Sequence, residues 1–361
     1  MKKSKGIIPF ILSVMLLSGA FAFALTGCGG TPPPAKDAEG YDRDGLKADF
    51  LSKADEVTVT DTSVTFTDAS GKGSITVAKN PQRVINLYAS FTTLWYEAGG
   101  TVYGLIGGAS SSTLYEEQIG RDVSKDDGVV TVAASSSGSG WNVESILSHS
   151  PDLIICSTAM SGYAKISAPA EALSVPVIAV EYDDFSDYLK WYKVFCNISG
   201  HAELWDSVAV DALEEVTDIL MKAPLENNPV IFSMFSGSTS LQANLEGTVM
   251  GAMAKQLRAK NIADSWFNPD SGSRLPINLE SVYLGDPDMI LIQCHSEGDA
   301  VTEIVDALYG TDPVWNALRA VKDGKVYYMQ KTLFHNKPNR KFAEAYKIMA
   351  EHLYPDVDFG E

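Results

Sequence analysis

Two stretches of the chain, NVESILSHSPDLII at Asn142–Ile155 and NLESVYLGDPDMIL at Asn278–Leu291, repeat one pattern. In both copies Asn-x-Glu-Ser is followed, after five residues, by Pro-Asp and an apolar run. The asparagine suits a helix N-cap, and the helix dipole favours a carboxylate in the first turn. The proline ends the helix, and the apolar run is typical of a buried parallel strand. Each copy therefore predicts one helix followed by one buried strand.

Short apolar runs alternate with helical segments on both sides of this pattern. Strands separated by helices predict parallel sheets with crossover connections, so the fold class is α/β with two similar, mostly parallel lobes and a ligand cleft between them. The strands are expected at Arg83–Leu87, Val102–Ile106, Leu153–Ser157 and Val177–Val180, and then at Val230–Met234, Met289–Cys294 and Lys325–Met329.

One long helix is expected between the lobes, from His201 to Lys222. Its apolar residues recur at spacings of three and four, and Pro224 ends it. At 1.5 Å per residue this helix would span about 33 Å. The chain of 361 residues exceeds one comfortable core, which favours two lobes. The expected organisation is a signal peptide (1–27), a tether (28–56) with a short helix near Leu46–Ala54, an N-terminal lobe opening with a hairpin (57–199), the interlobe helix (200–225) and a C-terminal lobe (226–361).

The N-terminus carries export signals. Lys2, Lys3 and Lys5 precede the apolar run Gly6–Ala24, which is typical of a secretory signal peptide. The following Leu25-Thr26-Gly27-Cys28 resembles a bacterial lipobox. This resemblance implies cleavage before Cys28, lipidation of its thiol and an extracytoplasmic protein anchored to the outer face of the cell membrane. The alternative is an uncleaved membrane anchor, since the apolar stretch is nearly long enough to span a bilayer.

Composition and missing motifs narrow the class of function. A net charge of −18 argues against nucleic-acid binding, which needs a basic face. The sequence has no G-x-S-x-G, H-E-x-x-H, Walker A or C-x-x-C motif, so no enzyme activity is predicted. The remaining cysteines, Cys156, Cys196 and Cys294, are interpreted as buried small apolar residues.

The lipobox, the hairpin, Pro81-Gln82-Arg83-Val84-Ile85, the doubled pattern and the long helix together resemble the substrate-binding lipoproteins of ABC importers. The resemblance is to the class that carries ferric siderophores, haem and cobalamin, and it covers roughly residues 57–354. It implies a monomer that delivers an iron complex to a permease dimer with its ATPase, without a resident cofactor. A corrinoid ligand, or a tethered sensor or adhesin of the same fold, remains an alternative.

The two glutamates of the doubled pattern, Glu144 and Glu280, have two interpretations. As helix-start carboxylates they stabilise the helices locally. In the family that the chain resembles, the matching glutamates pair with arginines of the two permease subunits. The resemblance therefore implies a docking role for both residues.

Ligands of open α/β sheets lie beyond the carboxyl ends of the strands. The loops expected there are rich in hydroxyl and aromatic side chains and poor in charge, which suits a bulky, partly apolar ligand with oxygen groups. The serine-rich runs are equally compatible with solvated turns. The predicted ligand-binding residues are Tyr88, Ser90, Phe91, Ser110, Ser111, Ser137, Trp141, Thr158, Tyr163, Tyr182, Phe235, Ser236, Arg274, His295 and His335.

Three of these residues suggest specific chemistry. The guanidinium of Arg274 suits carboxylate or ferric-complex oxygens, although a surface arginine would also fit. Only His295 and His335, of five histidines, are expected to reach the cleft. Two histidines are too few for a bare zinc or manganese ion, so no metal site is predicted, but one histidine suffices as a haem axial ligand.

Overall fold

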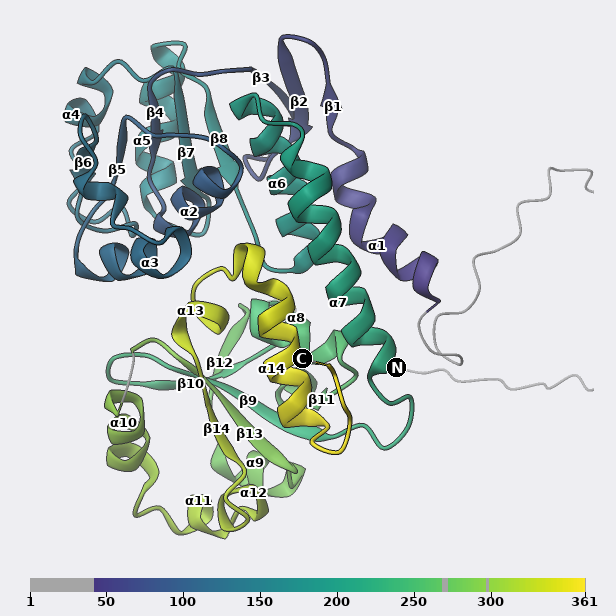
Figure 1. Ribbon diagram of the computed structural model, residues 1–361. Helices are drawn as coiled ribbons and strands as arrows, with labels where there is room; N and C mark the ends of the chain where they lie inside the picture. The colour runs from purple at the N-terminus through teal and green to yellow at the C-terminus, as the bar shows by residue number, and fades with distance from the viewer. Residues whose placement is uncertain (1–41, 268–271, 297–298, 361) are drawn as a thin grey trace, which may run out of the picture. The chain divides into compact units, whose positions relative to one another are not determined.

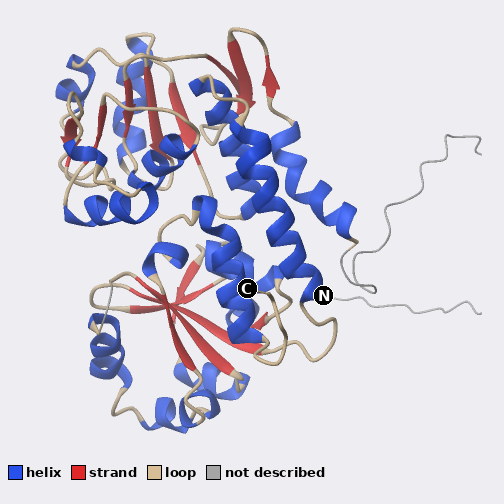
Figure 2. Cartoon of the chain, in the orientation of Figure 1, coloured by secondary structure: helices blue, strands red, loops and turns tan. Residues whose placement is uncertain are grey.

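The computed structural model describes residues 42–267, 272–296 and 299–360. The expected signal peptide and Cys28 lie outside the described residues. Two α/β lobes and a set of long helices make up the described chain (Figure 1). Strands form the interior of each lobe and helices lie outside them (Figure 2).

The N-terminal lobe is built on a five-stranded sheet in which every pairing is parallel. Its strand order is β6-β5-β4-β7-β8, which confirms the expected parallel sheet; only β6 was not predicted. The strands are β4 (Val84–Asn86), β5 (Gly104–Ile106), β6 (Val130–Ala133), β7 (Leu153–Ser157) and β8 (Val177–Val180). The helices are α2 (Ala89–Glu97), α3 (Ala109–Ile119), α4 (Val143–Ser148) and α5 (Gly162–Ala172), with the 3-10 turn η1 (Val123–Lys125).

An antiparallel hairpin precedes this sheet, as the alternating sequence predicted. The hairpin consists of β2 (Ser63–Thr67) and β3 (Ser74–Ala78), and β1 (Thr58–Val59) pairs with β2 as a third antiparallel strand. Val64 and Phe66 point into the core, while their neighbours along β2 are more exposed. This alternation is the period of two expected of a half-buried strand.

The sheet of the C-terminal lobe is mixed, and in this respect the expected similarity of the lobes is incomplete. Its order is β12-β10-β9-β13-β14, with β11 paired to β9, and β10 runs antiparallel to both of its neighbours. The strands are β9 (Val230–Ser236), β10 (Leu241–Asn244), β11 (Lys260–Asn261), β12 (Arg274–Pro276), β13 (Met289–Cys294) and β14 (Val326–Met329).

Helices and 3-10 turns connect these strands and close the chain. They are α8 (Val249–Gln256), η3 (Ile262–Trp266), α9 (Leu279–Gly285), α10 (Ala300–Tyr309), α11 (Pro313–Ala317), α12 (Arg319–Lys322), α13 (Lys331–Phe334), η4 (Asn339–Lys341) and α14 (Phe342–Leu353).

The doubled pattern forms the same local structure twice. The side chain of Asn142 accepts a hydrogen bond from the backbone N–H of Ser145 at 2.9 Å, and that of Asn278 accepts one from Ser281 at 3.1 Å. Each short helix then leads into a fully buried strand that has neighbours on both sides, β7 in one lobe and β13 in the other. The pattern therefore builds an interior strand of each sheet together with the helix before it.

The interlobe helix begins later than His201. Gly200 ends α6 (Phe185–Ser199) in the left-handed conformation at φ 87°, and a turn follows. The helix then starts with the π-helical turn η2 (Trp205–Ala209) and continues as α7 (Val210–Lys222). One face of α7 is buried, and α14 packs against α7 (Figure 1).

The segment expected to be a tether contains the short helix predicted near Leu46–Ala54, and this helix is longer than predicted and packed into the core. Helix α1 (Arg43–Asp55) buries Leu46, Phe50 and Ala54 and packs against α6 and α7. The ring of Phe50 meets that of Phe185 edge to face at 5.1 Å. The apolar residues recur every four positions, so they form one stripe that α6 and α7 cover.

The three cysteines of the described chain are free and buried, as expected. Burial raises the pKa of the Cys156 and Cys196 thiols to about 12 and that of Cys294 to about 11. Thiols in this state are poor nucleophiles, because the thiolate is the reactive form.

Replacement of Phe50 by alanine tests whether α1 belongs to the cooperative core. Phe50 is 3% exposed, so Phe50→Ala should lower the free energy of unfolding by about 3–5 kcal/mol. Phe267, at 59% exposure, is a matched control whose alanine variant should change it by less than about 0.5 kcal/mol. Urea unfolding measures both, and equal losses would mean that α1 is not part of the core.

Candidate functional site

A cluster of basic and aromatic side chains lies at the carboxyl ends of the C-terminal lobe's strands. Phe235 is on β9, Arg274 on β12, His295 directly follows β13, and His335 ends α13. The guanidinium carbon of Arg274 lies 4.0 Å from the centre of the Phe235 ring. The His335 ring stacks on the same ring at 5.5 Å, with 17° between the planes. This cluster is the core of the candidate site.

Two buried amides hold Arg274. Its Nε donates to Oδ1 of Asn244 at 2.9 Å, and its Nη2 donates to Oε1 of Gln293 at 3.0 Å. Nδ2 of Asn244 also donates to Oε1 of Gln293 at 2.9 Å, and Nε2 of Gln293 donates to the carbonyl of Phe334. Burial lowers the pKa of Arg274, while the charges of Tyr88 and Asp183 act in the opposite direction.

The two histidines contact each other. Nδ1 of His295 and Nε2 of His335 are 3.2 Å apart, and the rings meet edge to face at 4.9 Å. Burial lowers the pKa of His335 to about 3, and burial followed by Lys331 and Arg274 lowers the pKa of His295. Both imidazoles are therefore neutral near pH 7, and a neutral imidazole is the form that ligates iron.

The N-terminal lobe contributes Tyr88, at the start of α2. Its ring lies 4.5 Å from that of Phe91. Burial raises the pKa of the Tyr88 hydroxyl; Asp183 adds to this shift and Arg274 opposes it. The charge of Arg274 therefore acts on Tyr88, which makes Tyr88 a candidate contribution of the N-terminal lobe to the site.

The segment after β14 connects the lobes through several polar contacts. Nζ of Lys337 donates to the carbonyl of Tyr182 and pairs with Oδ1 of Asp183 at 3.3 Å. Nζ of Lys331 lies 3.2 Å from Oγ of Ser110. A cavity of about 360 Å³ lies beside this segment, lined by Glu117, Cys294, Ser296, Tyr328, Met329, Gln330, Lys331 and Thr332.

The other predicted ligand-binding residues lie elsewhere or are engaged in packing. Phe91 and Tyr182 are buried and stack at 6.3 Å, which makes them supports of the site rather than its surface. Tyr163 lies near Asp68 and Lys72 of the hairpin instead of near Arg274. Ser90, Ser111, Trp141 and Ser236 are buried, Thr158 is half-buried, and Ser110 and Ser137 are exposed.

Several residues of the site were missed in the sequence. Asn244 was hidden because β10 was not predicted. Gln293 was counted as core because it stands in the apolar run of β13, and its polarity in that run was the available signal. Asp183 and Lys337 stood in the expected loops but were not selected.

Glu97, at the end of α2, is an unusual carboxyl group at the junction of the lobes. Its Oε2 accepts a hydrogen bond from the backbone N–H of Arg340 at 3.2 Å, and its buried Oε1 has no partner among the described residues. Burial raises the pKa of Glu97 to about 8, although the charges of Arg340 and Lys341 oppose the shift. The carboxyl group is therefore largely protonated at neutral pH.

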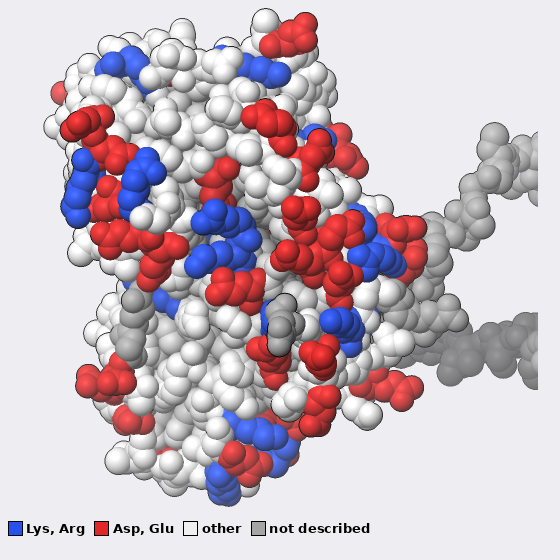
Figure 3. Space-filling model, viewed as in Figure 1, with Lys and Arg blue, Asp and Glu red and all other residues white. Residues whose placement is uncertain are grey.

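The glutamates of the doubled pattern are both exposed. Glu144 lies in the first turn of α4 and Glu280 in the first turn of α9. Acidic side chains are spread over much of the face drawn in Figure 3, with basic groups among them.

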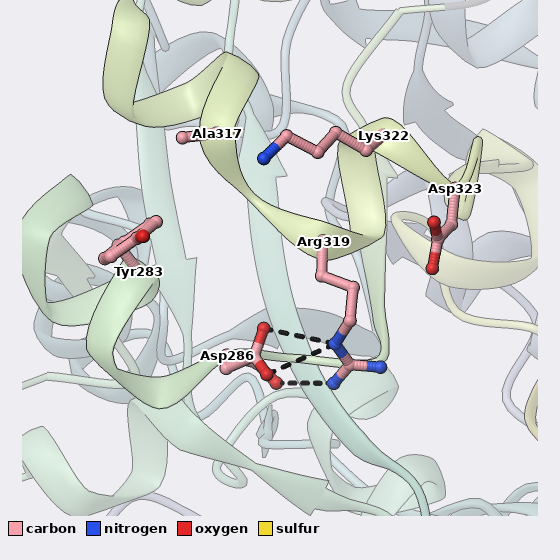
Figure 4. A pocket seen from close by; sticks show the side chains of 6 residues that line it. All are labelled: Tyr283, Asp286, Ala317, Arg319, Lys322 and Asp323. Carbon is pink, nitrogen blue, oxygen red and sulfur yellow. Dashed lines mark hydrogen bonds and ion pairs between the residues drawn. The ribbon is translucent and has the colours of Figure 1, made fainter.

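A second cavity, of about 440 Å³, lies at the end of α9 between α11 and α12. In Figure 4 Arg319 points toward Asp286, and the pair is joined by contacts at 3.2 Å. Arg319 also pairs with Asp288 at 2.9 Å. Two carboxylates therefore neutralise the arginine of this cavity, and its other cation, Lys322, is exposed.

Sequence comparison decides the family. The profile of the periplasmic binding proteins matches residues 93–333, about two thirds of the chain. This chain belongs to the periplasmic binding protein family. The resemblance inferred from the doubled pattern and the long helix is thereby confirmed.

Individual relatives of this periplasmic binding protein are distant but extensive. The ABC transporter substrate-binding lipoprotein YvrC of Bacillus subtilis is 24% identical over 362 residues, which are 99% of each chain. The Fe(3+)-citrate-binding protein YfmC of the same organism is 22% identical and covers 71% of this chain and 75% of its own. The structure of S. aureus IsdE complexed with heme shares the fold at a TM-score of 0.60 and 16% identity, covering 75% of this chain and 98% of that one.

Two further observations concern metals and membranes. Within residues 42–267, 272–296 and 299–360, no group of three or more His, Cys, Asp or Glu side chains is arranged to hold a metal ion. None of the helices in those ranges is long and apolar enough to cross a membrane.

The pKa of Glu97 predicts a pH-dependent stability. Since burial raises this pKa from 4.5 to about 8, the contribution of Glu97 is complete below pH 4.5 and is lost as the pH rises through 8. Glu97→Gln stays neutral, so its advantage over the wild type should grow across this window, to the order of a few kcal/mol. Unfolding curves between pH 4 and 9 measure the effect.

The exposed Glu116 serves as a control for this experiment, because Glu116→Gln also removes one carboxylate. A constant difference between Glu97→Gln and the wild type at every pH would show that folding does not change the pKa of Glu97.

Proposed function

We propose that this protein is the substrate-binding lipoprotein of an ABC importer and that it captures a ferric complex carrying acidic oxygen groups. The observation that carries the proposal is Arg274, a half-buried arginine with no carboxylate within ion-pair distance in the described chain. A buried cation without a counter-ion is costly, and an anionic ligand would supply that counter-ion.

The surroundings of Arg274 support an organic complex over a free inorganic anion. Phe235, whose ring contacts Arg274 and His335, and Tyr88 make these surroundings aromatic, and the two imidazoles of His295 and His335 are neutral near pH 7. An arginine fork pairs with a carboxylate through two parallel hydrogen bonds. The name of the relative YfmC, a Fe(3+)-citrate-binding protein, fits a ligand of this chemistry.

Haem is the second candidate ligand, and it is favoured by the histidine pair. His295 is exposed, and its Nδ1 contacts His335, which leaves Nε2 on the opposite side of the ring for another partner. A second group that orients an imidazole is a common feature of metal ligation. Haem propionates would pair with Arg274 in the same way as the carboxylates of a chelate. A corrinoid ligand remains a further alternative.

Export and anchoring belong to the same proposal. Cys28 would be lipidated after cleavage of residues 1–27, and the protein would act on the outer face of the cell membrane. The relative YvrC is described as a lipoprotein. A tethered sensor or adhesin would share the anchor but would not stimulate a permease.

A ligand panel with Arg274 variants tests the binding proposal. The wild type should bind ferric citrate or haemin saturably in calorimetric titrations, and Arg274→Met should weaken binding by about tenfold or more, because a hydrogen bond to a charged group is lost. Arg274→Lys should restore only part of the affinity, since lysine lacks the planar fork.

Arg319→Met is the matched control, because it removes an arginine from the other cavity and should leave the affinity unchanged. Tight binding of zinc or manganese, with no response to ferric citrate, haemin, a ferric hydroxamate or cobalamin, would refute the proposal.

The docking role of Glu144 and Glu280 is tested separately. Truncating one member of an interfacial charge pair often costs about 2–5 kcal/mol. Glu144→Ala, Glu280→Ala and above all the double variant should therefore reduce uptake and permease-stimulated ATP hydrolysis. Loss of a helix-start carboxylate costs only about 0.3–1 kcal/mol of stability, so the fold and ligand affinity should persist.

Glu303 is the control for docking, because it is an exposed glutamate in the first turn of α10. Glu303→Ala should transport normally. Normal transport by the double variant, or its failure to bind ligand, would leave the doubled pattern a purely structural feature.

A further inference from the structure

The hydrogen bonds of Arg274 are made to neutral groups. Its two partners, Asn244 and Gln293, are 0% and 2% exposed, so water does not compete for their oxygens. Asp183, the acid whose charge acts on Arg274, is already paired with Lys337 at 3.3 Å. The positive charge of Arg274 is thus held in place without being neutralised by the described protein.

The two amides are themselves fixed. Asn244 donates to Gln293 at 2.9 Å, and Gln293 donates to the carbonyl of Phe334. Both amides therefore direct an oxygen at the guanidinium, because their N–H groups are used elsewhere. A carboxylate at either position would be almost the same size but would carry a full negative charge.

We propose that Asn244 and Gln293 determine the charge specificity of the site: they orient Arg274 through uncharged oxygens and so reserve its charge for an anionic ligand. The inference rests on the proposed function, because it assumes that Arg274 faces the ligand. Asn244 and Gln293 act through Arg274 and are positioning residues.

Lys331 has no carboxylate partner among the described residues and remains a second cation near the site, whereas the other neighbouring groups do not replace the charge of Arg274. Lys337 is paired with Asp183, and His295 and His335 are neutral near pH 7. Lys331 contacts the hydroxyl of Ser110. An acid introduced beside Arg274 would form a buried ion pair there and remove the main attraction for an anion.

Near-isosteric substitutions test the inference. Asn244→Asp and Gln293→Glu should each weaken the binding of ferric citrate by about tenfold or more, because the ligand loses its charged partner. Binding of ferrioxamine B, a cationic ferric complex, should be unchanged or tighter. Asn316→Asp, at an exposed position on α11, changes the net charge equally and should alter neither affinity. Circular dichroism and thermal unfolding establish that each variant is folded.

A double-mutant cycle separates this role from a purely structural one. In the background of Arg274→Met, Asn244→Asp should have little further effect on ferric citrate, because its effect is exerted through the guanidinium. Equal losses in both backgrounds, or equal losses of anionic and cationic complexes, would overturn the inference.

A measurement without ligand distinguishes this inference from the proposed function. Phenylglyoxal modifies unprotonated guanidines, and an adjacent carboxylate favours the protonated form. Arg274 should therefore react more slowly in Asn244→Asp than in the wild type, as followed by peptide mass spectrometry. If the wild type binds no ferric complex, the proposed function fails. The modification rates would still show whether an uncharged side chain at Asn244 leaves the charge of Arg274 unpaired. Identical rates would overturn the inference.

Discussion

The hydrogen bonds of Asn339 to the N-terminal lobe are the constraint on which part of the candidate site depends. Its amide nitrogen donates to the Ser90 carbonyl at 3.1 Å, to Thr93 at 2.8 Å and to Gln118 at 3.1 Å. The residue is fully buried with φ at 55°, a left-handed conformation that asparagine tolerates better than most residues. These bonds hold a segment of the C-terminal lobe against α2 and α3. The same segment carries His335 and Lys337, so the position of both follows from this contact.

Carboxyl and amide side chains have different roles at the junction of the two lobes. Carboxyl groups serve the contacts between lobes, as Asp183 does with Lys337 and Glu97 does with the backbone of Arg340. Amides hold Arg274, the candidate ligand-binding arginine. This division has a physical reason, because a carboxylate beside Arg274 would stabilise the empty site and compete with an anionic ligand.

The doubled pattern shows how one local structure serves two surroundings. Ile146 and Val282 occupy the same position of the pattern, and both are buried. Two residues further on, Ser148 stands in one copy and Leu284 in the other, which is 84% exposed. The two copies of the pattern therefore share the N-cap and the buried position, whereas the exposed surfaces of their helices differ. Any partner that contacts both lobes meets two acidic helix starts with unlike neighbours.

The sequence by itself determined the α/β class, the hairpin, seven of the strands and the two capped helices of the doubled pattern. These features depend on local physics, because apolar periodicity, N-caps and prolines act within a few residues. The tertiary structure decided the rest. A short helix was predicted near Leu46–Ala54, but only the structure shows that α6 and α7 cover the narrow apolar stripe of α1. Helix α6 was not predicted, and most of its residues are buried.

The candidate site was likewise predicted in part from the sequence and decided in part by the tertiary structure. Strand ends indicated the loops near Tyr88, His295 and His335, since parallel strands present their carboxyl ends at one edge. Arg274 was also predicted in such a loop, but it begins strand β12. Which side chains meet there was decided by packing between segments far apart in the chain. Arg274 and Gln293 are 19 residues apart and Arg274 and Asn244 are 30 apart, and only the mixed sheet aligns them. The sequence around Gln293 does not show which side chain this amide will contact, because its partners come from neighbouring strands of the folded sheet.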